Sequence, residues 1–394
     1  MRNTHKTYRF RLMPNKEQEI LLSKHFGCVR FVYNYFLNQR IKQYQEHQES
    51  DDYYAQARAL TKLKKQAETN WLTEVNSQTL QFSLSCLDTA YVNYFRKNAR
   101  FPRFKSRKDK NSFTVPQFGR IESNKIKIPK FKDGIKVNFH RAVKGKVGKM
   151  TITRTPTGKY FVSIFTEQHI EQFPETDKQI GIDLGLKEFA VTSDNERFEN
   201  NRYTEKYAHT LKKALQHLSR KQKGSNGFER QRLKVAKIHE KISNCRWDTL
   251  HKVSYELVRD NQLIATEDLN VKGMIKNRKL SKHIADAGWG NFVNLLQYKC
   301  DWYGRKLVKI DRFYPSSKTC HVCGWINQDL NLSIREWTCR NGHQLERDHN
   351  ASINILKEGL KIHGKGLAIT KVEDNSDYSG STSYETRSPF IAFA

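Results

Sequence analysis

Three carboxylates stand where apolar strands end or where a helix begins. Asp183 lies within the apolar run Ile180–Leu184, Glu267 closes the apolar run Gln262–Glu267, and Asp348 opens a segment with helical spacing of apolar residues. Burying an acidic side chain is costly unless a cation or hydrogen-bond donors meet it. Each residue alone also fits a structural role, either as a hydrogen-bonded strand acid or as a helix N-cap.

The joint pattern of these acids favours metal-dependent chemistry. Two strands ending at one edge of a sheet, beside a helix N-terminus, would bring Asp183, Glu267 and Asp348 together. The charges would repel one another without cations. Mg²⁺ prefers a few carboxylates and retained water, and a pair of ions can polarise a phosphate and activate water. We therefore predict these residues to be catalytic and to hold two Mg²⁺ ions.

A second cluster has the spacing of a zinc site. Cys320 and Cys323 form a C-x2-C pair, and Cys339 and His343 form a C-x3-H pair. Three thiolates and one imidazole make a closed tetrahedral set, which is typical of structural zinc. The segment between the pairs has few apolar residues, so we expect the metal to hold it together. His321 and His349 are alternative fourth ligands.

Apolar periodicity predicts the elements that must position these groups. The strand that carries Asp183 turns at Gly185 and returns as Phe189–Thr192, and Lys306–Ile310 is a further strand. Arg202–Asp260 reads as a helical hairpin that turns at residues 224–227. Its polar face is strongly basic, through Lys212, Lys213, Arg220, Lys221, Lys223, Arg230, Arg232, Lys234 and Lys237.

The N-terminal part combines strands with a helical block. Lys6–Leu12 alternates as a strand, and residues from about 16 to 98 have helical spacing. From residue 112 to 167 apolar residues tend to recur at every second position. The predicted strands are Ser112–Val115, Lys125–Ile128, Ile135–Phe139, Lys149–Thr153 and Tyr160–Thr166. We predict a small antiparallel barrel that includes the first strand, with the helical block as an insertion.

The overall charge points to a polyanionic partner. The 394 residues contain 70 Lys and Arg against 41 Asp and Glu, a net charge of +29. A membrane surface is the rival partner, but no run reaches the ~18 apolar residues of a spanning helix, and we expect no signal peptide. Three of the seven cysteines cluster, which favours metal binding over disulfides. We expect a cytoplasmic, nucleoid-associated protein.

One segment interleaves aromatic rings with cations. Phe101–Lys110 contains Arg103, Phe104, Lys105 and Arg107. Rings can stack on bases while cations attract phosphates, so we predict nucleic-acid contacts there. A solvated linker is the alternative.

Several motifs together resemble one family. Gly-Ile-Asp183-Leu-Gly, Ala-Thr-Glu267-Asp-Leu and Arg-Asp348-His-Asn-Ala look like the three motifs of a split RuvC-type nuclease, with the zinc cluster between the second and third. The runs Arg30–Asn34, Phe101–Phe104, Asp286–Gly290 and Tyr314–Ser317 extend the likeness. From about residue 7 to 356 the chain resembles the TnpB family, the transposon-encoded RNA-guided DNA endonucleases related to type V CRISPR effectors.

The resemblance implies a multidomain α+β architecture. A wedge β-barrel (1–14 and 111–170) would be interrupted by a helical recognition domain (15–110). A RuvC, RNase H-like nuclease domain (178–316 and 346–362) would hold a zinc-binding, target-nucleic-acid-loading insert (317–345), and 363–394 would be a disordered tail.

The resemblance also implies that the protein belongs to a prokaryotic transposon and has two nucleic-acid partners. One is a guide RNA from the transposon end, and the other is double-stranded DNA. A monomeric ribonucleoprotein would cut this DNA beside a short transposon-adjacent motif. The residues that contact this adjacent DNA motif would be Tyr53, Ser77, Gln78 and Gln81. Two positions depart from the family pattern: His343 replaces the second Cys of the usual second pair, and Glu346 stands where Asp commonly precedes Arg-Asp.

Two other readings compete with a guided nuclease. A guided DNA-binding repressor would be expected to lack one of the three carboxylates, and none is missing. A zinc-finger protein that reads bases directly would explain the cysteines and the charge, but it leaves the strand carboxylates without a purpose.

Overall fold

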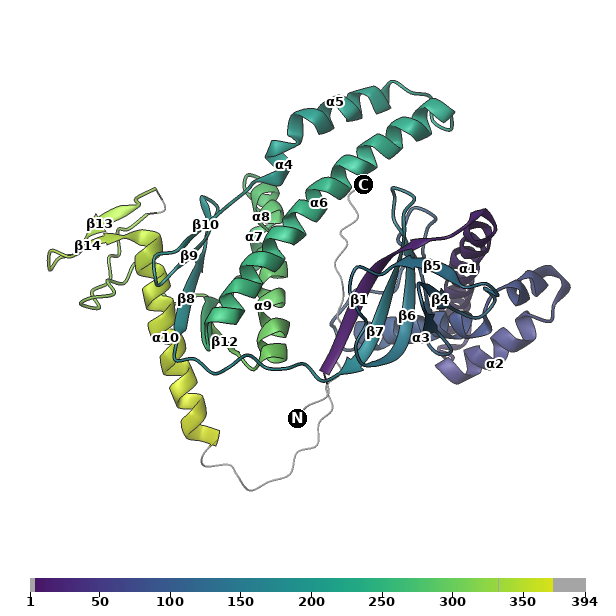
Figure 1. The fold of residues 1–394 in the computed structure, drawn as a ribbon, viewed down its shortest axis with the longest axis horizontal. Coiled ribbons are helices and arrows are strands. Elements are labelled where there is room, and N and C mark those ends of the chain that lie inside the picture. Colours follow the sequence, from purple (N-terminus) through teal and green to yellow (C-terminus); the bar gives the residue numbers. More distant parts are fainter. Residues whose placement is uncertain (1–3, 332, 371–394) are drawn as a thin grey trace. The chain divides into compact units, whose positions relative to one another are not determined.

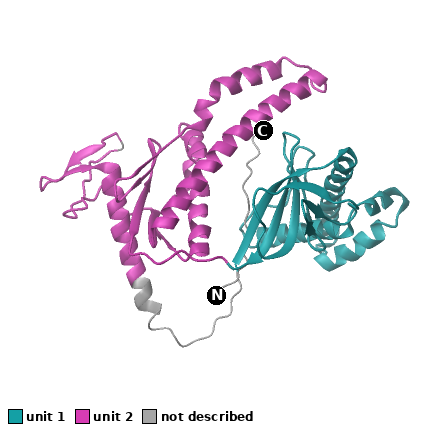
Figure 2. Ribbon diagram, in the orientation of Figure 1, with its two compact units in different colours: residues 1–169, 387–394 teal, residues 170–386 magenta. Residues whose placement is uncertain are grey.

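A computed structural model describes residues 4–331 and 333–370. The chain divides into two compact units at residues 169 and 170 (Figure 2). Among the described residues, each helix is too short or too polar to cross a lipid bilayer.

The first unit is a curled antiparallel sheet with an inserted helical block (Figure 1). The strand order is β2-β6-β7-β1-β5-β4-β3, so β1 joins the later strands as predicted. The described strands leave β2 and β3 as edges, so the small antiparallel barrel predicted from the sequence is an open, curled sheet. The strands are β1 Thr4–Met13, β2 Asn111–Val115, β3 Arg120–Glu122, β4 Lys125–Lys127, β5 Ile135–Asn138, β6 Lys146–Arg154 and β7 Tyr160–Gln168.

The helical block begins at a capping box. The Asn15 side chain accepts from the backbone N–H of Gln18 at 2.8 Å, and the Gln18 side chain accepts from the Asn15 N–H at 3.2 Å. The helices are α1 Lys16–His47, α2 Tyr53–Leu63, the 3₁₀ helix η1 Ala67–Glu74 and α3 Ser77–Phe95. Their apolar faces and the inner face of the sheet form one core, which contains Phe10, Phe36 and Leu84.

The second unit is built on a five-stranded mixed sheet of order β10-β9-β8-β11-β12, in which β8, β11 and β12 are parallel. The strands are β8 Gln179–Leu184, β9 Glu188–Thr192, β10 Arg197–Glu199, β11 Leu263–Glu267 and β12 Lys306–Ile310, with the hairpin β13 Glu336–Thr338 and β14 Gln344–Glu346. The helices are α4 Tyr203–Lys206, α5 Ala208–Ser219, α6 Asn226–Asp260, α7 Val271–Met274, α8 Ser281–Ala287, α9 Trp289–Tyr303 and α10 Arg347–Thr370.

Alternate residues of strand β11, which lies between β8 and β12, supply two cores on opposite faces of this sheet. Ile264 packs with α6 and α9, whereas Leu263 and Ala265 pack with Ile355 of α10. Figure 1 accordingly shows α10 on one side of the strands and α6 and α9 on the other.

The sequence prediction missed four short strands, the helices α7 to α9 and one helical extension. The strands β3, β10, β13 and β14 have only three residues each, too few for a periodic pattern to register. The predicted tail at 363–394 is wrong for residues 363–370, because α10 continues to Thr370. The rest of that predicted tail lies outside the described residues.

Candidate active site and metal cluster

Asp183 and Glu267 are neighbours on adjacent parallel strands. The register pairs Ile182 of β8 with Thr266 of β11, so the next residue on each strand is a carboxylate. Paired residues of neighbouring strands lie about 5 Å apart and point to the same face. The convergence of two strand ends expected from the sequence is therefore present in the sheet.

Helix α10 packs against these strands with almost no space between them. A Cβ added at Gly181 of β8 would lie 2.1 Å from the backbone oxygen of Ser352 and 2.7 Å from the backbone nitrogen of Leu356. One added at Gly359 would lie 2.5 Å from the Cβ of Ala265. Glycine at these two contacts lets the helix backbone rest on β8 and β11. The first turn of α10, which carries Asp348, is thereby fixed relative to the sheet.

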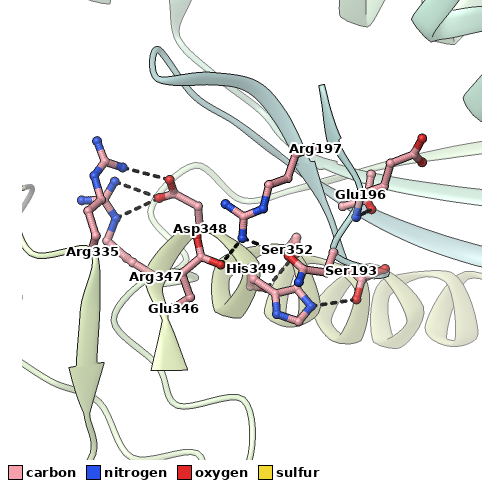
Figure 3. Close-up of polar contacts among 11 residues, drawn as sticks. Ser193, Glu196, Arg197, Arg335, Glu346, Arg347, Asp348, His349 and Ser352 are labelled. Carbon is pink, nitrogen blue, oxygen red and sulfur yellow. Dashed lines mark hydrogen bonds and ion pairs between the residues drawn. The ribbon is translucent and has the colours of Figure 1, made fainter. Parts of the chain in front are cut away.

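Two arginines bind Asp348 (Figure 3). Arg335 donates to Asp348 Oδ2 at 2.8 Å, and Arg347 donates to Oδ1 from Nη2 at 2.8 Å and from Nε at 3.0 Å. Arg335 comes from the segment between the two cysteine pairs. The adjacent Glu346 pairs with Arg197 of β10. Asp348 is mostly buried and is held by charge on both oxygens.

The three acids affect one another electrostatically. Burial, followed by the charges of Glu267 and Asp348, raises the pKa of Asp183 to about 8, while Arg347 and Arg335 oppose the shift. Burial also raises the pKa of Glu267. Ser316 opposes that second shift, because its hydroxyl donates to Glu267 Oε1 at 2.6 Å.

Two buried asparagines of α10 bind the loop that carries Ser316. The side-chain nitrogen of Asn354 donates to the carbonyls of Ser316 at 2.8 Å and Thr319 at 2.6 Å. The side-chain nitrogen of Asn350 donates to Thr319 O at 2.8 Å, and its oxygen accepts from the backbone N–H of His321 at 2.9 Å. This loop, residues 316–321, therefore connects Glu267 to the first cysteine pair through contacts with a single helix.

The ring of His349 fixes the other side of the first turn of α10. His349 Nε2 lies 3.1 Å from the carbonyl oxygen of Ser193, and the Ser193 hydroxyl accepts from the backbone N–H of Gly181 at 3.1 Å (Figure 3). The turn after β9, the start of β8 and the start of α10 are thus joined by hydrogen bonds.

Cys320, Cys323, Cys339 and His343 form one cluster, with their ligand atoms all within 4.8 Å of one another. The Sγ atoms of Cys323 and Cys339 lie 3.7 Å apart, and Cys320 Sγ lies 3.8 Å from His343 Nδ1. For Zn–S bonds of about 2.3 Å, a tetrahedron has edges of about 3.8 Å, so the geometry fits zinc. The two alternative histidines have other partners: His321 Nδ1 contacts Asn350, and His349 contacts Ser193.

The residues of the first unit that we predict to contact nucleic acid differ in their exposure and in their contacts within the protein. Arg103 is exposed and lies 3.4 Å from Asp109, and Phe104 and Arg107 are also exposed. The ammonium of Lys105 instead packs over the ring of Tyr33 at 3.6 Å, so this lysine has a structural contact. Burial lowers the pKa of Lys105.

The residues predicted to read an adjacent motif lie at the starts of two helices. Tyr53 begins α2 and is partly buried, while Ser77, Gln78 and Gln81 lie in the first turns of α3. Lys64 donates to the Ser77 hydroxyl at 2.6 Å, and Gln81 is exposed. Whether these side chains contact DNA remains a prediction.

The predicted helical hairpin is present as α5 and α6, and Figure 1 shows it extending beyond the sheet. At its base Asp286 accepts from the backbone N–H of Thr204 at 2.9 Å and pairs with Arg246 at 2.5 Å. All nine cations named above for this hairpin are exposed, and Lys241 adds a tenth. Only Glu229 and Glu240 offset them between residues 208 and 241.

Sequence reasoning did not assign roles to Arg335, Ser316, Asn350 or Asn354. Ser316 and Asn350 lie in motifs named above, but their partners are distant in the sequence. Only the docking of α10 brings those partners together.

Models of known protein families match three parts of the chain. Family models match residues 163–278 ("Probable transposase"), 289–355 ("Cas12f1-like, TNB domain") and 1–49 ("Helix-turn-helix domain"). In that last range, described residues 4–47 form strand β1 and the single long helix α1, rather than two helices joined by a turn.

Two curated relatives match nearly the whole chain. A Streptomyces pristinaespiralis protein named "Putative RNA-guided DNA endonuclease" is 38% identical over 95% of this chain and 94% of its own length. "Putative RNA-guided DNA endonuclease InsQ" of Escherichia coli strain K12 is 31% identical over 92% of this chain and 94% of its own.

The fold is also similar to a solved structure. The protein chain of a Cas12f1-sgRNA-target DNA complex has a TM-score of 0.51 at 11% identity, covering 90% of this chain and 98% of that one. With relatives this similar over their full lengths, the chain belongs to the TnpB family of transposon-encoded RNA-guided DNA endonucleases.

Proposed function

We propose that this protein, guided by a bound RNA, cuts double-stranded DNA next to a short transposon-adjacent motif, using one RuvC-type site. The observation that carries the proposal is the in-register pair Asp183 and Glu267 at the sheet edge, with Asp348 near enough to raise the pKa of Asp183. The names of the full-length relatives support the same activity.

The donor set fits Mg²⁺. Carboxylate oxygens are the ligands Mg²⁺ prefers, and a pair of divalent cations would offset the burial and the repulsion that together raise the pKa of Asp183. When bound, two Mg²⁺ ions would polarise the scissile phosphate and activate water. Asp183 and Glu267 would hold them from the strands, and Asp348 from the first turn of α10.

The surrounding side chains have distinct tasks in this proposal. Ser316 keeps Glu267 oriented and favours its charged form through the 2.6 Å hydrogen bond. Arg335 and Arg347 hold Asp348 in place. Because a guanidinium binds phosphate as readily as carboxylate, Arg335 is also suited to stabilise negative charge on a DNA phosphate at the site.

One zinc ion would occupy the Cys320, Cys323, Cys339 and His343 cluster as a structural metal. All four ligands come from protein, which leaves no open position for chemistry. The ion would hold the β13–β14 segment, and with it Arg335, near Asp348.

RNA supplies sequence choice in this proposal. The protein would hold the guide and its heteroduplex by backbone and shape, while base pairing selects the target. Contacts from Tyr53, Ser77, Gln78 and Gln81 would read the adjacent motif. The basic hairpin α5–α6 and the net charge of +29 suit this polyanionic cargo. We propose a monomeric ribonucleoprotein that works in the prokaryotic cytoplasm at the nucleoid.

A plasmid-cleavage assay tests the proposal. The protein is purified with its co-expressed RNA, that RNA is sequenced, and a plasmid carrying the matching target is incubated with Mg²⁺. Asp183→Ala should abolish cutting and leave RNA binding intact, whereas Asp248→Ala, an exposed carboxylate on α6, should cut normally. Cutting by the Asp183→Ala protein would end the proposed role of this site. DNA binding that ignores added RNA would instead favour a protein that reads bases directly.

A further inference from the structure

Three aromatic rings lie exposed at the end of α3 and on the segment that follows it. The exposed fractions are 38% for Tyr94, 71% for Phe95 and 48% for Phe101. Their ring centroids form one group, with Tyr94 5.4 Å from Phe95 and 5.2 Å from Phe101. We call these residues the three-ring platform. Exposed aromatic groups of this size usually mark a binding surface.

The three-ring platform rests on a rigid base. Buried Tyr91 lies beneath it, with ring centroids 5.7 Å from Phe101 and 6.2 Å from Phe95. The guanidinium of Arg40 lies 4.9 Å from the ring of Tyr91 and pairs with Asp88 at 3.0 Å. The rings are therefore held before any ligand arrives, which lowers the entropy cost of binding.

The chain on the other side of Phe101 is also fixed. Asn34 of α1 makes two 2.8 Å hydrogen bonds to the backbone of Lys105, one to its N–H and one to its carbonyl. The side chain of Lys105 packs on Tyr33. Two motifs noticed in the sequence, Arg30–Asn34 and Phe101–Phe104, are thus joined by contacts that hold this segment in place.

The same stretch of chain as the three-ring platform is rich in exposed cations. Arg96, Lys97, Arg100, Arg103 and Arg107 are all exposed. The two acids of the same stretch are already engaged: Asp88 pairs with Arg40, and Asp109 accepts from the backbone N–H of Ser106 at 2.6 Å and pairs with Arg103 at 3.4 Å. Exposed rings together with an excess of exposed cations match a strand whose bases stack while its phosphates are attracted.

We propose that Tyr94, Phe95 and Phe101 stack on unpaired bases of the bound guide RNA. The proposal rests on the proposed function, which supplies that RNA. RNA is favoured over DNA because an exposed aromatic group invites aggregation in a free protein. The guide remains bound throughout, whereas target DNA is present only during cleavage.

A binding assay with the full-length protein tests this site. The probe is a fluorescent transcript of the RNA that co-purifies with the protein, titrated at fixed salt. Phe95→Ala/Phe101→Ala should weaken RNA binding about tenfold or more, since each stacked base contributes measurably to affinity. Phe95→Tyr/Phe101→Tyr retains the rings and should restore it. Ile20→Ala removes another exposed apolar side chain, flanked by Glu17 and Glu19, and should bind as the unchanged protein does.

A second measurement does not depend on the folding of a variant. Ultraviolet cross-linking of the unchanged ribonucleoprotein, followed by mass spectrometry, should find RNA on peptides that contain Tyr94, Phe95 or Phe101. Unchanged RNA affinity of the double alanine variant, or cross-links confined to other segments, would overturn the proposal. So would a variant that binds RNA normally but loses only target DNA. Plasmid cutting by the unchanged protein reports separately on the proposed function.

Discussion

The hydroxyl of Ser316 shows how one small side chain serves the candidate site from a distance in sequence. It donates to Glu267 Oε1 at 2.6 Å and opposes the burial that raises the pKa of this carboxyl group. A hydrogen bond to a charged group contributes about 1.5–3 kcal/mol. Ser316 therefore belongs to the proposed metal site although it would bind no metal itself.

Ser316→Ala should weaken Mg²⁺ use without abolishing cutting. Glu267 loses its hydrogen bond, its pKa rises further, and the Mg²⁺ concentration for half-maximal cleavage should increase about tenfold or more. Cleavage titrated with Mg²⁺ at two pH values measures this effect, which should be larger at the lower pH. Ser317→Ala, on the next residue, is the matched control. An unchanged Mg²⁺ requirement in the Ser316 variant would contradict this role.

Asp183 makes the Mg²⁺-free protein sensitive to pH. Its pKa is about 8 in the folded chain and about 3.9 when unfolded, so the folded state holds a proton that the unfolded state has released. Stability is therefore full below about pH 4 and is lost as the pH rises toward 8. Asp183→Asn removes this loss. We expect its melting temperature to exceed that of the unchanged protein at pH 8, with a smaller difference at pH 5.5.

The melting measurements need resin-treated buffer, since a soluble chelator would also extract zinc. Asp194→Asn, an exposed neighbour, controls for the loss of one charge. Added Mg²⁺ should stabilise the unchanged protein more than the Asp183→Asn protein. An equal gain for Asp183→Asn at both pH values would show that Asp183 does not titrate as described.

At the scale of elements, the contact between α10 and β8 decides where Asp348 lies. The Cβ of an alanine at position 181 would meet backbone atoms of Ser352 and Leu356, which cannot rotate away. Overpacking of this kind costs about 1–3 kcal/mol. Gly181→Ala should therefore lower stability by that amount in chemical denaturation and also reduce cutting.

A second glycine substitution is the control for the loss of a glycine's backbone flexibility without a steric clash. Gly290 of α9 has open space where its Cβ would be, so Gly290→Ala should be neutral or slightly stabilising. If both variants behaved alike, the close packing of α10 on the sheet would be in doubt.

The asparagine contacts of α10 connect the zinc cluster to the sheet edge. Asn354→Ala removes two donations, to Ser316 O and Thr319 O, and leaves two buried carbonyls with fewer partners. We expect a loss of about 1–3 kcal/mol in stability and faster zinc release to a colorimetric chelator. Exposed Lys361→Ala on the same helix is the control, because Lys361 pairs with Glu358 of α10 and not with the loop. Zinc release at the normal rate from the Asn354 variant would refute the connection.

The elements that follow a regular pattern could be predicted from sequence, and those set by tertiary contacts could not. Alternation and apolar runs indicated β8, β11 and β12, and the spacing of Cys320 and Cys323 indicated a metal cluster. The pairing of Arg335 with Asp348 could not be predicted, because it depends on a β-hairpin folding back over a helix. Likewise, Lys105 looked like a phosphate contact until its packing on Tyr33 was seen.

For the whole molecule, the excess of positive charge should control nucleic-acid affinity. The α5–α6 hairpin contributes ten exposed cations to this excess. With about 6–10 phosphate contacts, RNA affinity should fall about 10³–10⁵-fold between roughly 50 and 200 mM salt.

Replacing Lys234, Lys237 and Lys241 by Gln should make the salt dependence shallower by up to about 3 in the slope of log K against log salt. Fluorescence anisotropy at several salt concentrations measures this slope. A slope that the triple variant leaves unchanged would place the RNA elsewhere on the protein.

The position of α10 in the chain has a consequence for synthesis in the cell. Asp348 belongs to the last described helix, so a ribosome must translate both strands of the sheet edge and the whole cysteine-rich segment before this acid exists. A nascent or prematurely terminated chain could already present Asp183 and Glu267 but would lack the third acid. The order of translation thus delays the capacity to cut DNA until the start of α10 has been made, and this timing would protect the host genome from shorter products.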